Sequence, residues 1–193
     1  MQCKNNAECQ DTAHTSLHLG SNAQCNTGTH LCQCAARDPG NVVVNGGFDS
    51  DVASWKPSMA GNSITFTSSD GFFCNNSGSA TVTGMFGMQQ CVPLASGKPS
   101  YFLGATYWQF GGTDPFSCSV EWYSKSDCSS GDLGFGGALM GGTDSNNSGW
   151  IQLNGAAFTV PSGAAGAMIQ CSQFDNFSIQ IDQIYFNYAT DHF

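Results

Sequence analysis

The sequence has few basic residues: Lys and Arg together number 5 against 14 Asp and Glu, which gives a net charge of −9 over 193 residues. Proteins that bind nucleic acid neutralise phosphates with Lys and Arg, and proteins that dock on anionic lipid need a polybasic patch. Neither partner is therefore predicted. The chain also lacks any apolar stretch near the roughly 20 residues that a transmembrane helix needs, so no membrane insertion is predicted.

Helical periodicity is absent as well. Instead, short segments that alternate apolar and polar residues are separated by turn residues, and the chain contains 24 glycines. This pattern predicts an all-β fold, an antiparallel β-sandwich of the jelly-roll type. The predicted strands cover residues 42–44, 63–67, 79–83, 88–94, 101–110, 117–124, 133–139, 150–158, 165–171 and 177–188.

Catalytic groups are scarce. The four histidines lie within the first thirty residues or at position 192, too far from the β-region for a His-activated Ser or Cys nucleophile there. Glycoside cleavage by paired acids would need two carboxyl groups, yet the β-region offers Glu121 and aspartates in turn-like contexts. The sequence therefore predicts that the protein is not an enzyme.

Ten cysteines are present, an even number that favours disulfides in an oxidising compartment and hence an extracellular, secreted or cell-surface protein. Five of them lie in residues 1–38, which have almost no large apolar side chains and must be held by cross-links. We predict a disulfide-held module over residues 1–40 and a β-domain over residues 41–193. Zinc held by His14, His18, His30 and Cys32 is a weaker alternative, because thiols pair with each other under oxidising conditions.

The other five cysteines lie in the predicted β-domain. Cys118 and Cys128 flank a compact strand and turn, so a local bridge between them is expected. Cys91 and Cys171 both lie on predicted strands and could join the sheets. Cys74 is then left as a partner for the N-terminal module. Spacing alone does not fix these pairs.

Several motifs occur in a characteristic order: Asn45-Gly-Gly-Phe48-Asp49 with Trp55, Gln90-Cys-Val92, Tyr101-Phe-Leu-Gly-Ala-Thr-Tyr107 and Ile181-Asp-Gln-Ile184. This order resembles that of the β-sandwich carbohydrate-binding modules of families 4 and 9, a group of galactose-binding-like jelly rolls. The spacing of the N-terminal cysteines loosely resembles small modules of the epidermal-growth-factor type.

The resemblance implies a non-catalytic protein that binds polysaccharide and holds a structural calcium ion between its first and last strands. The matching acidic positions are Asp49 and Asp182, and calcium prefers such hard oxygen ligands. Along the last strand the apolar positions change phase at Asp182, which predicts a β-bulge that redirects this carboxylate. Ordinary loop or edge roles for the two aspartates are the alternative.

A ligand-binding face is also implied. Alternate residues of the predicted strand 101–110 point to opposite faces, and the related modules bury the face that contains Tyr101 and Tyr107. Phe102 and Trp108 would then lie on the opposite, concave face. The next strand alternates so that Glu121 and Tyr123 point outward, and we expect them beside Trp108. The predicted site therefore uses Trp108 and Tyr123 for stacking on sugar rings, with Phe102, Glu121 and Gln109 beside them. Burial of Trp108 in the core is the alternative, and Trp55 and Trp150 are expected there.

Together these features predict a secreted, non-catalytic glycan-binding protein with a polysaccharide as its partner. The alternative is a self-assembling extracellular structural subunit, a surface filament or matrix protein that binds copies of itself through the same sandwich. Low charge repulsion, odd cysteine counts on both sides of residue 40 and edge strands that are available for pairing favour this alternative.

Overall fold

The computed structural model describes residues 24–26, 31–33, 40–69, 78–85, 87–111, 114–142, 149–174 and 177–189. These parts of the chain are built of β-strands and contain no helix that could cross a membrane. The strands are β1 (Gln24–Asn26), β2 (Leu31–Gln33), β3 (Lys56–Pro57), β4 (Ser63–Thr67), β5 (Ser79–Thr83), β6 (Met88–Pro93), β7 (Ser100–Gln109), β8 (Ser117–Tyr123), β9 (Asp132–Met140), β10 (Ile151–Thr159), β11 (Gly166–Ser172) and β12 (Ser178–Asn187).

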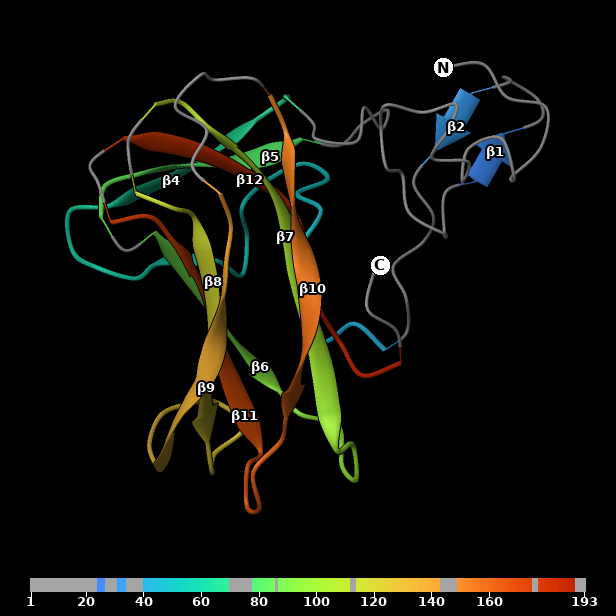
Figure 1. Ribbon diagram of the computed structural model, residues 1–193, viewed down its shortest axis with the longest axis vertical. Coiled ribbons are helices and arrows are strands. Elements are labelled where there is room, and N and C mark those ends of the chain that lie inside the picture. The colour runs from blue at the N-terminus through green and yellow to red at the C-terminus, as the bar shows by residue number, and fades with distance from the viewer. Residues whose placement is uncertain are drawn as a thin grey trace.

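Two five-stranded antiparallel sheets form the predicted β-sandwich (Figure 1). We call the sheet with the order β10-β7-β12-β5-β4 sheet I and the sheet with the order β3-β6-β11-β8-β9 sheet II. Each predicted strand after the first is present, within one residue of its predicted bounds. The all-β jelly-roll prediction is therefore confirmed.

The first predicted strand, 42–44, is not a strand. Its neighbour Asn41 forms an isolated bridge with Asn187, and the Val42 N–H donates to the Phe186 carbonyl at 3.0 Å. Pairing stops there because Asn45 adopts a positive φ of 53°, which turns the chain away. The short strands β1, β2 and β3 were not predicted.

The strands β1 and β2 pair with each other, with Cys25 opposite Cys32. Both strands fall inside the predicted N-terminal module, and the boundary at residue 40 stays a prediction. The zinc alternative at His14, His18 and His30 lies outside the described residues. So does Cys74.

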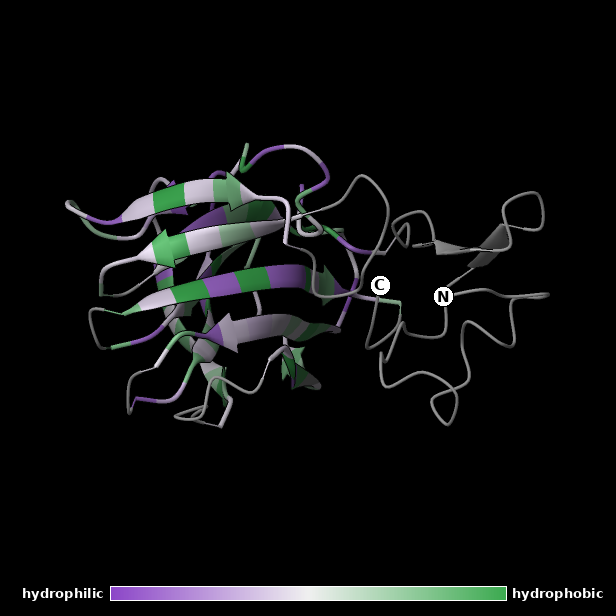
Figure 2. Ribbon diagram, turned by 90° about the horizontal axis from the view of Figure 1, so that it is seen from above, coloured by the Kyte–Doolittle hydropathy of each residue, from purple (hydrophilic) through white to green (hydrophobic). Residues whose placement is uncertain are grey.

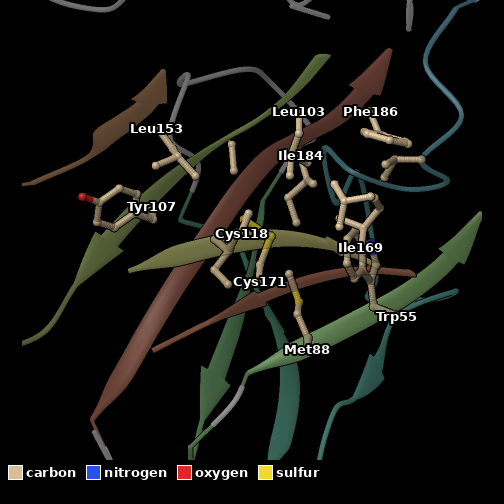
Figure 3. Close-up of a cluster of buried hydrophobic side chains, with 14 of the residues drawn as sticks. Trp55, Met88, Leu103, Tyr107, Cys118, Leu153, Ile169, Cys171, Ile184 and Phe186 are labelled. Carbon is tan, nitrogen blue, oxygen red and sulfur yellow. A yellow bond between two sulfur atoms is a disulfide. The ribbon is translucent and has the colours of Figure 1, made fainter. Parts of the chain in front are cut away.

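The core fills the space between the two sheets. Along most strands hydrophobic and hydrophilic residues alternate, so that one face of each sheet is apolar (Figure 2). Trp55, Met88, Leu103, Ile184 and Phe186 come from different parts of the chain and meet in this core (Figure 3). Burying such side chains contributes roughly 1.5–3 kcal/mol each, which makes this layer the main source of stability.

Two disulfides among the described residues lie within sheet II and its β8–β9 loop, and both differ from the predicted pairs. Cys118 bonds to Cys171, and Cys91 bonds to Cys128. Cys118 and Cys171 are direct cross-strand partners of β8 and β11 and lie fully buried among the core side chains (Figure 3). The predicted bridge between Cys118 and Cys128 is wrong because Cys118 points into the core near the start of β8, whereas Cys128 lies in the loop beyond its other end.

A buried amide holds the N-terminal segment of the β-domain against sheet II. The Val44 N–H donates to Oε1 of Gln90 at 2.7 Å, and Nε2 of Gln90 donates to the Val44 carbonyl at 2.8 Å. Gln90 is 5% exposed and faces the core side of β6. Its side chain thus stands in for the strand pairing that residues 42–44 lack.

Candidate functional site

The two ends of the β-domain lie side by side, which the predicted pairing of Asp49 with Asp182 requires. The Ile184 N–H donates to the Gly46 carbonyl at 2.9 Å, and the Phe186 N–H donates to Oδ1 of Asn41 at 3.0 Å. The opening motif therefore packs against the second half of β12.

The bulge predicted at Asp182 is confirmed. Asp182 is opposite Thr106 on β7, but the next paired residue is Tyr185, opposite Gly104, so one extra residue is accommodated between them. Gln183 adopts a positive φ of 51° at this point. The Asp182 side chain is fully buried, and its Oδ1 accepts a hydrogen bond from the Gln183 N–H at 2.6 Å.

The opening motif forms a turn that leaves Asp49 at the surface. Phe48 adopts a φ of 46°, is fully buried and packs against Trp55 with ring centroids 6.0 Å apart. The Trp55 indole N–H donates to the Asn45 carbonyl at 3.1 Å, which confirms that Trp55 is a core residue. Asp49, the next residue after Phe48, is exposed.

Gly47 links this turn to the bulge. A Cβ atom at Gly47 would lie 3.6 Å from Nε2 of Gln183 and 4.0 Å from Oδ1 of Asp49. The side chain that follows Asp182 and the carboxylate of Asp49 therefore border the same glycine. Both carboxylates are hard oxygen donors of the kind that calcium prefers, and the contacts at Gly47 bring the Gln183 side chain, not that of Asp182, close to the Asp49 turn. Across the described ranges, no three His, Cys, Asp or Glu side chains form a common metal-ligand group, so carbonyls would have to complete the shell.

Along β7 the predicted alternation is confirmed. Tyr101, Leu103, Ala105 and Tyr107 are buried in the core, whereas Phe102 and Trp108 are only half-buried and lie on the outer face of sheet I. Trp108 is therefore not among the buried core residues, and the alternative that it is buried in the core is wrong.

An aromatic cluster surrounds Trp108 on this face. Its ring stacks on Phe110 at a centroid distance of 5.1 Å and lies 6.0 Å from the ring of Trp150. Placing Trp150 in the core was wrong: Ile151 pairs with the inward-facing Tyr107, so the preceding Trp150 falls on the outer side with Trp108. We call Trp108, Phe110 and Trp150 the aromatic cluster.

Amide side chains flank the aromatic cluster. Gln180 on β12 is the cross-strand partner of Trp108 on one side and of Thr81 on the other. Its Oε1 is buried and has no hydrogen-bond partner among the residues that the structure describes. Gln152 on β10 is opposite Thr106 and is exposed. Sequence reasoning missed Phe110, Trp150 and both glutamines, although the Trp108-x-Phe110 spacing already placed two aromatics on one face.

The other predicted ligand residues lie elsewhere. Glu121 and Tyr123 do point outward, but from β8, which belongs to sheet II. The chain crosses from one sheet to the other between β7 and β8, so the expected position beside Trp108 is wrong. Gln109 is fully buried, and its Nε2 donates to the Asp114 carbonyl at 2.8 Å; it faces away from Trp108 because the two residues are adjacent in a strand.

No protein-family model matches the chain, and no curated protein matches it. Solved structures do share its fold. A xylan-binding domain of carbohydrate-binding module family 22 gives a TM-score of 0.56 at 14% identity over 79% of this chain and 97% of that domain. The C-terminal family 22 module of Clostridium thermocellum Xyn10B gives 0.57 at 13% identity over 81% and 100%. A family 16 carbohydrate-binding module gives 0.53 at 19% identity over 75% and 97%.

The enzymatically active domain of bacteriophage CBA120 tailspike protein 4 also matches, with a TM-score of 0.59 at 16% identity over 80% of this chain. This chain spans only 22% of that protein. Together the matches confirm a β-sandwich of the type found in carbohydrate-binding modules. The assignment to families 4 and 9 and the likeness of the N-terminal residues to epidermal-growth-factor modules stay predictions.

Proposed function

We propose that the protein is a secreted, non-catalytic module that binds polysaccharide through the outer face of sheet I. The observation that carries this proposal is the aromatic cluster of Trp108, Phe110 and Trp150, with the amide of Gln180 beside it. Sugar rings present apolar C–H faces edged by hydroxyl groups, so they pack on aromatic rings and bond to amides. The fold shared with modules described as xylan-binding supports the same role.

The ligand class follows from charge. The five strands of sheet I contain no Lys or Arg, so this face has no strand-borne cation to pair with a uronate or sulfate group. A neutral glycan needs no cationic side chain as a partner. We therefore expect neutral polysaccharides to bind and anionic ones to bind weakly.

Affinity electrophoresis in gels that contain neutral or anionic polysaccharides tests the proposal. The Trp108→Ala variant should lose about tenfold in affinity, as expected for a central aromatic contact, and Trp150→Ala should weaken binding in the same gels. Phe135→Ala, on the outer face of sheet II, is the matched aromatic control and should leave retardation by neutral glycans unchanged. A wild-type protein that no polysaccharide retards, or variants as strongly retarded as the wild type, would refute the role of this face.

We also propose a structural calcium ion held by Asp182 and Asp49 with nearby carbonyls. A bound ion would stabilise the junction of the first and last segments and would supply no chemistry to a ligand. What supports it is the buried Asp182 carboxylate at a bulge whose neighbouring residue borders the Asp49 turn.

An extracellular location is proposed because two of the described cysteine pairs are disulfides, which persist in oxidising compartments.

The self-assembling subunit receives less support. Edge pairing needs a long, regular exposed strand, yet the two long edge strands, β9 and β10, are both interrupted by register shifts. The edge strand β4 is regular but has only 5 residues.

A further inference from the structure

The outer face of sheet II carries a second group of aromatic and acidic side chains, separate from the aromatic cluster. Glu121 on β8 has Phe135 of β9 as its cross-strand partner on one side and Met168 of β11 on the other. Phe135 is 69% exposed, the largest exposure among the hydrophobic side chains of the described residues. Leu133 and Met140 on the same strand are also exposed, and groups of exposed apolar side chains mark interaction surfaces.

Tyr123 and Glu121 are locked together beside this ring. They are two residues apart on β8 and so share one face, and the Tyr123 hydroxyl donates to Oε2 of Glu121 at 2.7 Å. This hydrogen bond, with burial and the negative charges of Glu121 and Asp132, raises the pKa of Tyr123 to about 12. The tyrosine therefore stays neutral, and its hydroxyl holds one of the two carboxylate oxygens of Glu121 in place.

A disulfide stiffens the same face. Cys91 is the cross-strand partner of Met168, and its bond to Cys128 pins the loop that joins β8 to β9. Hydrogen bonds from the Ser124 N–H to the Gly131 carbonyl at 2.8 Å and from the Cys128 N–H to the Lys125 carbonyl at 3.1 Å hold the loop itself. A ligand would therefore meet a surface that is already ordered, which lowers the entropic cost of binding.

The face is acidic. Asp132 is the cross-strand partner of Tyr123 and is exposed, and its Oδ1 accepts a hydrogen bond from the Gly134 N–H at 2.7 Å. Neither β8 nor β9 contains Lys or Arg. Lys125 lies in the loop after β8, and Lys56 lies on β3, three strands away and hence roughly 14 Å across the sheet. A second copy of this chain, with its net charge of −9, would be repelled. A cationic ligand is complementary.

We propose that Glu121, Tyr123, Asp132 and Phe135 form a second binding surface that takes polysaccharides with protonated amino groups, that is, deacetylated amino-sugar chains. The apolar face of such a sugar packs on Phe135, and its ammonium group pairs with Glu121 and Asp132 and gains from the nearby rings. A rigid sugar carries both features on one frame. A lysine side chain offers the same ammonium group but loses up to about 2 kcal/mol of conformational entropy when held, so a basic protein partner is less favoured.

Isothermal titration calorimetry with glucosamine oligomers tests this at low salt and mildly acidic pH, where the amines are protonated and the carboxylates ionised. All titrations use the Trp108→Ala background, in which the proposed neutral-glycan face is disabled. There the N-acetylated oligomer of equal length is the uncharged control ligand and should bind at least about tenfold more weakly, because the ammonium group contributes most of the contact. Glu121→Gln and Phe135→Ala should each weaken binding of the glucosamine oligomer roughly three- to fivefold.

A control variant separates this surface from overall charge. Asp114→Asn removes one negative charge near the other end of β8 and should bind the glucosamine oligomer like its Trp108→Ala parent. Equal binding of the acetylated and deacetylated oligomers, or no effect of Glu121→Gln, would overturn the proposal. So would an oligolysine of matched charge that binds as tightly, because the surface would then be a general cation site. None of these results bears on neutral glycan binding at Trp108.

Discussion

Removing the buried disulfide should cost much of the stability of the sandwich. Cys118 and Cys171 are separated by 53 residues in the sequence and are fully buried. In the chain-entropy description, a bridge that closes a loop of this length restricts the unfolded chain by about 4 kcal/mol at 25 °C. Because domains are stable by only about 5–15 kcal/mol, Cys118→Ala/Cys171→Ala should unfold at far lower urea concentration.

Loop closure and core packing can be separated in the same assay. Cys118→Val/Cys171→Ala restores side-chain volume without restoring the bond, so it should recover only the packing part of the loss. Cys91→Ala/Cys128→Ala opens a loop of 37 residues at a half-buried position and should lose a similar entropic term with little packing loss. Urea denaturation monitored by tryptophan fluorescence measures all three. A loss below about 1 kcal/mol for the buried pair would refute the reasoning, because neither the entropic nor the packing term would then be present.

Further outcomes are expected. Gln90→Leu removes both hydrogen bonds to Val44 and should lower the free energy of unfolding by about 1–3 kcal/mol. An unchanged urea midpoint would show that these two hydrogen bonds do not stabilise the fold. A chelator should lower the melting temperature of the wild type but not that of Asp182→Ala; a wild-type melting curve that does not respond would argue against the calcium ion. The folded-state pKa of Tyr123 lies above its unfolded value of 10.0. The hydrogen bond from Tyr123 to Glu121 therefore contributes fully to stability below pH 10, and this contribution is lost as the pH rises to about 12. Ultraviolet titration should show that Tyr123 ionises at lower pH in Glu121→Gln than in the wild type. Electron microscopy should show monodisperse particles, and fibres would support the self-assembling subunit instead.

The strands were predictable because their alternation is strong. The change of phase between Ile181 and Ile184 even located the bulge, since one extra residue is the only way to keep both side chains inward. Sheet membership was not predictable in the same way. Whether a chain turns back to its neighbour or crosses to the opposite layer between β7 and β8 depends on long-range packing that the residues 110–116 do not encode.

The disulfide pairs failed for a related reason. Cys118 and Cys171 are far apart in sequence but become neighbours once β8 and β11 pair, whereas sequence proximity favoured Cys128. Trp150 was misplaced because it lies just before β10, where the alternation along the strand does not yet assign a residue to a face. Local pattern thus indicated the elements, and only the three-dimensional pairing assigned their side chains to a site.

The bridge between Asn41 and Asn187 sets how this domain would behave in a longer polypeptide under load. Tension applied through residues 40 and 188 would enter and leave at neighbouring points, so it would act on the few bonds that join those points before it reached the body of the sandwich. The folded domain would then project to one side of the stretched chain. Both outer faces would stay available to ligands while neighbouring segments are pulled.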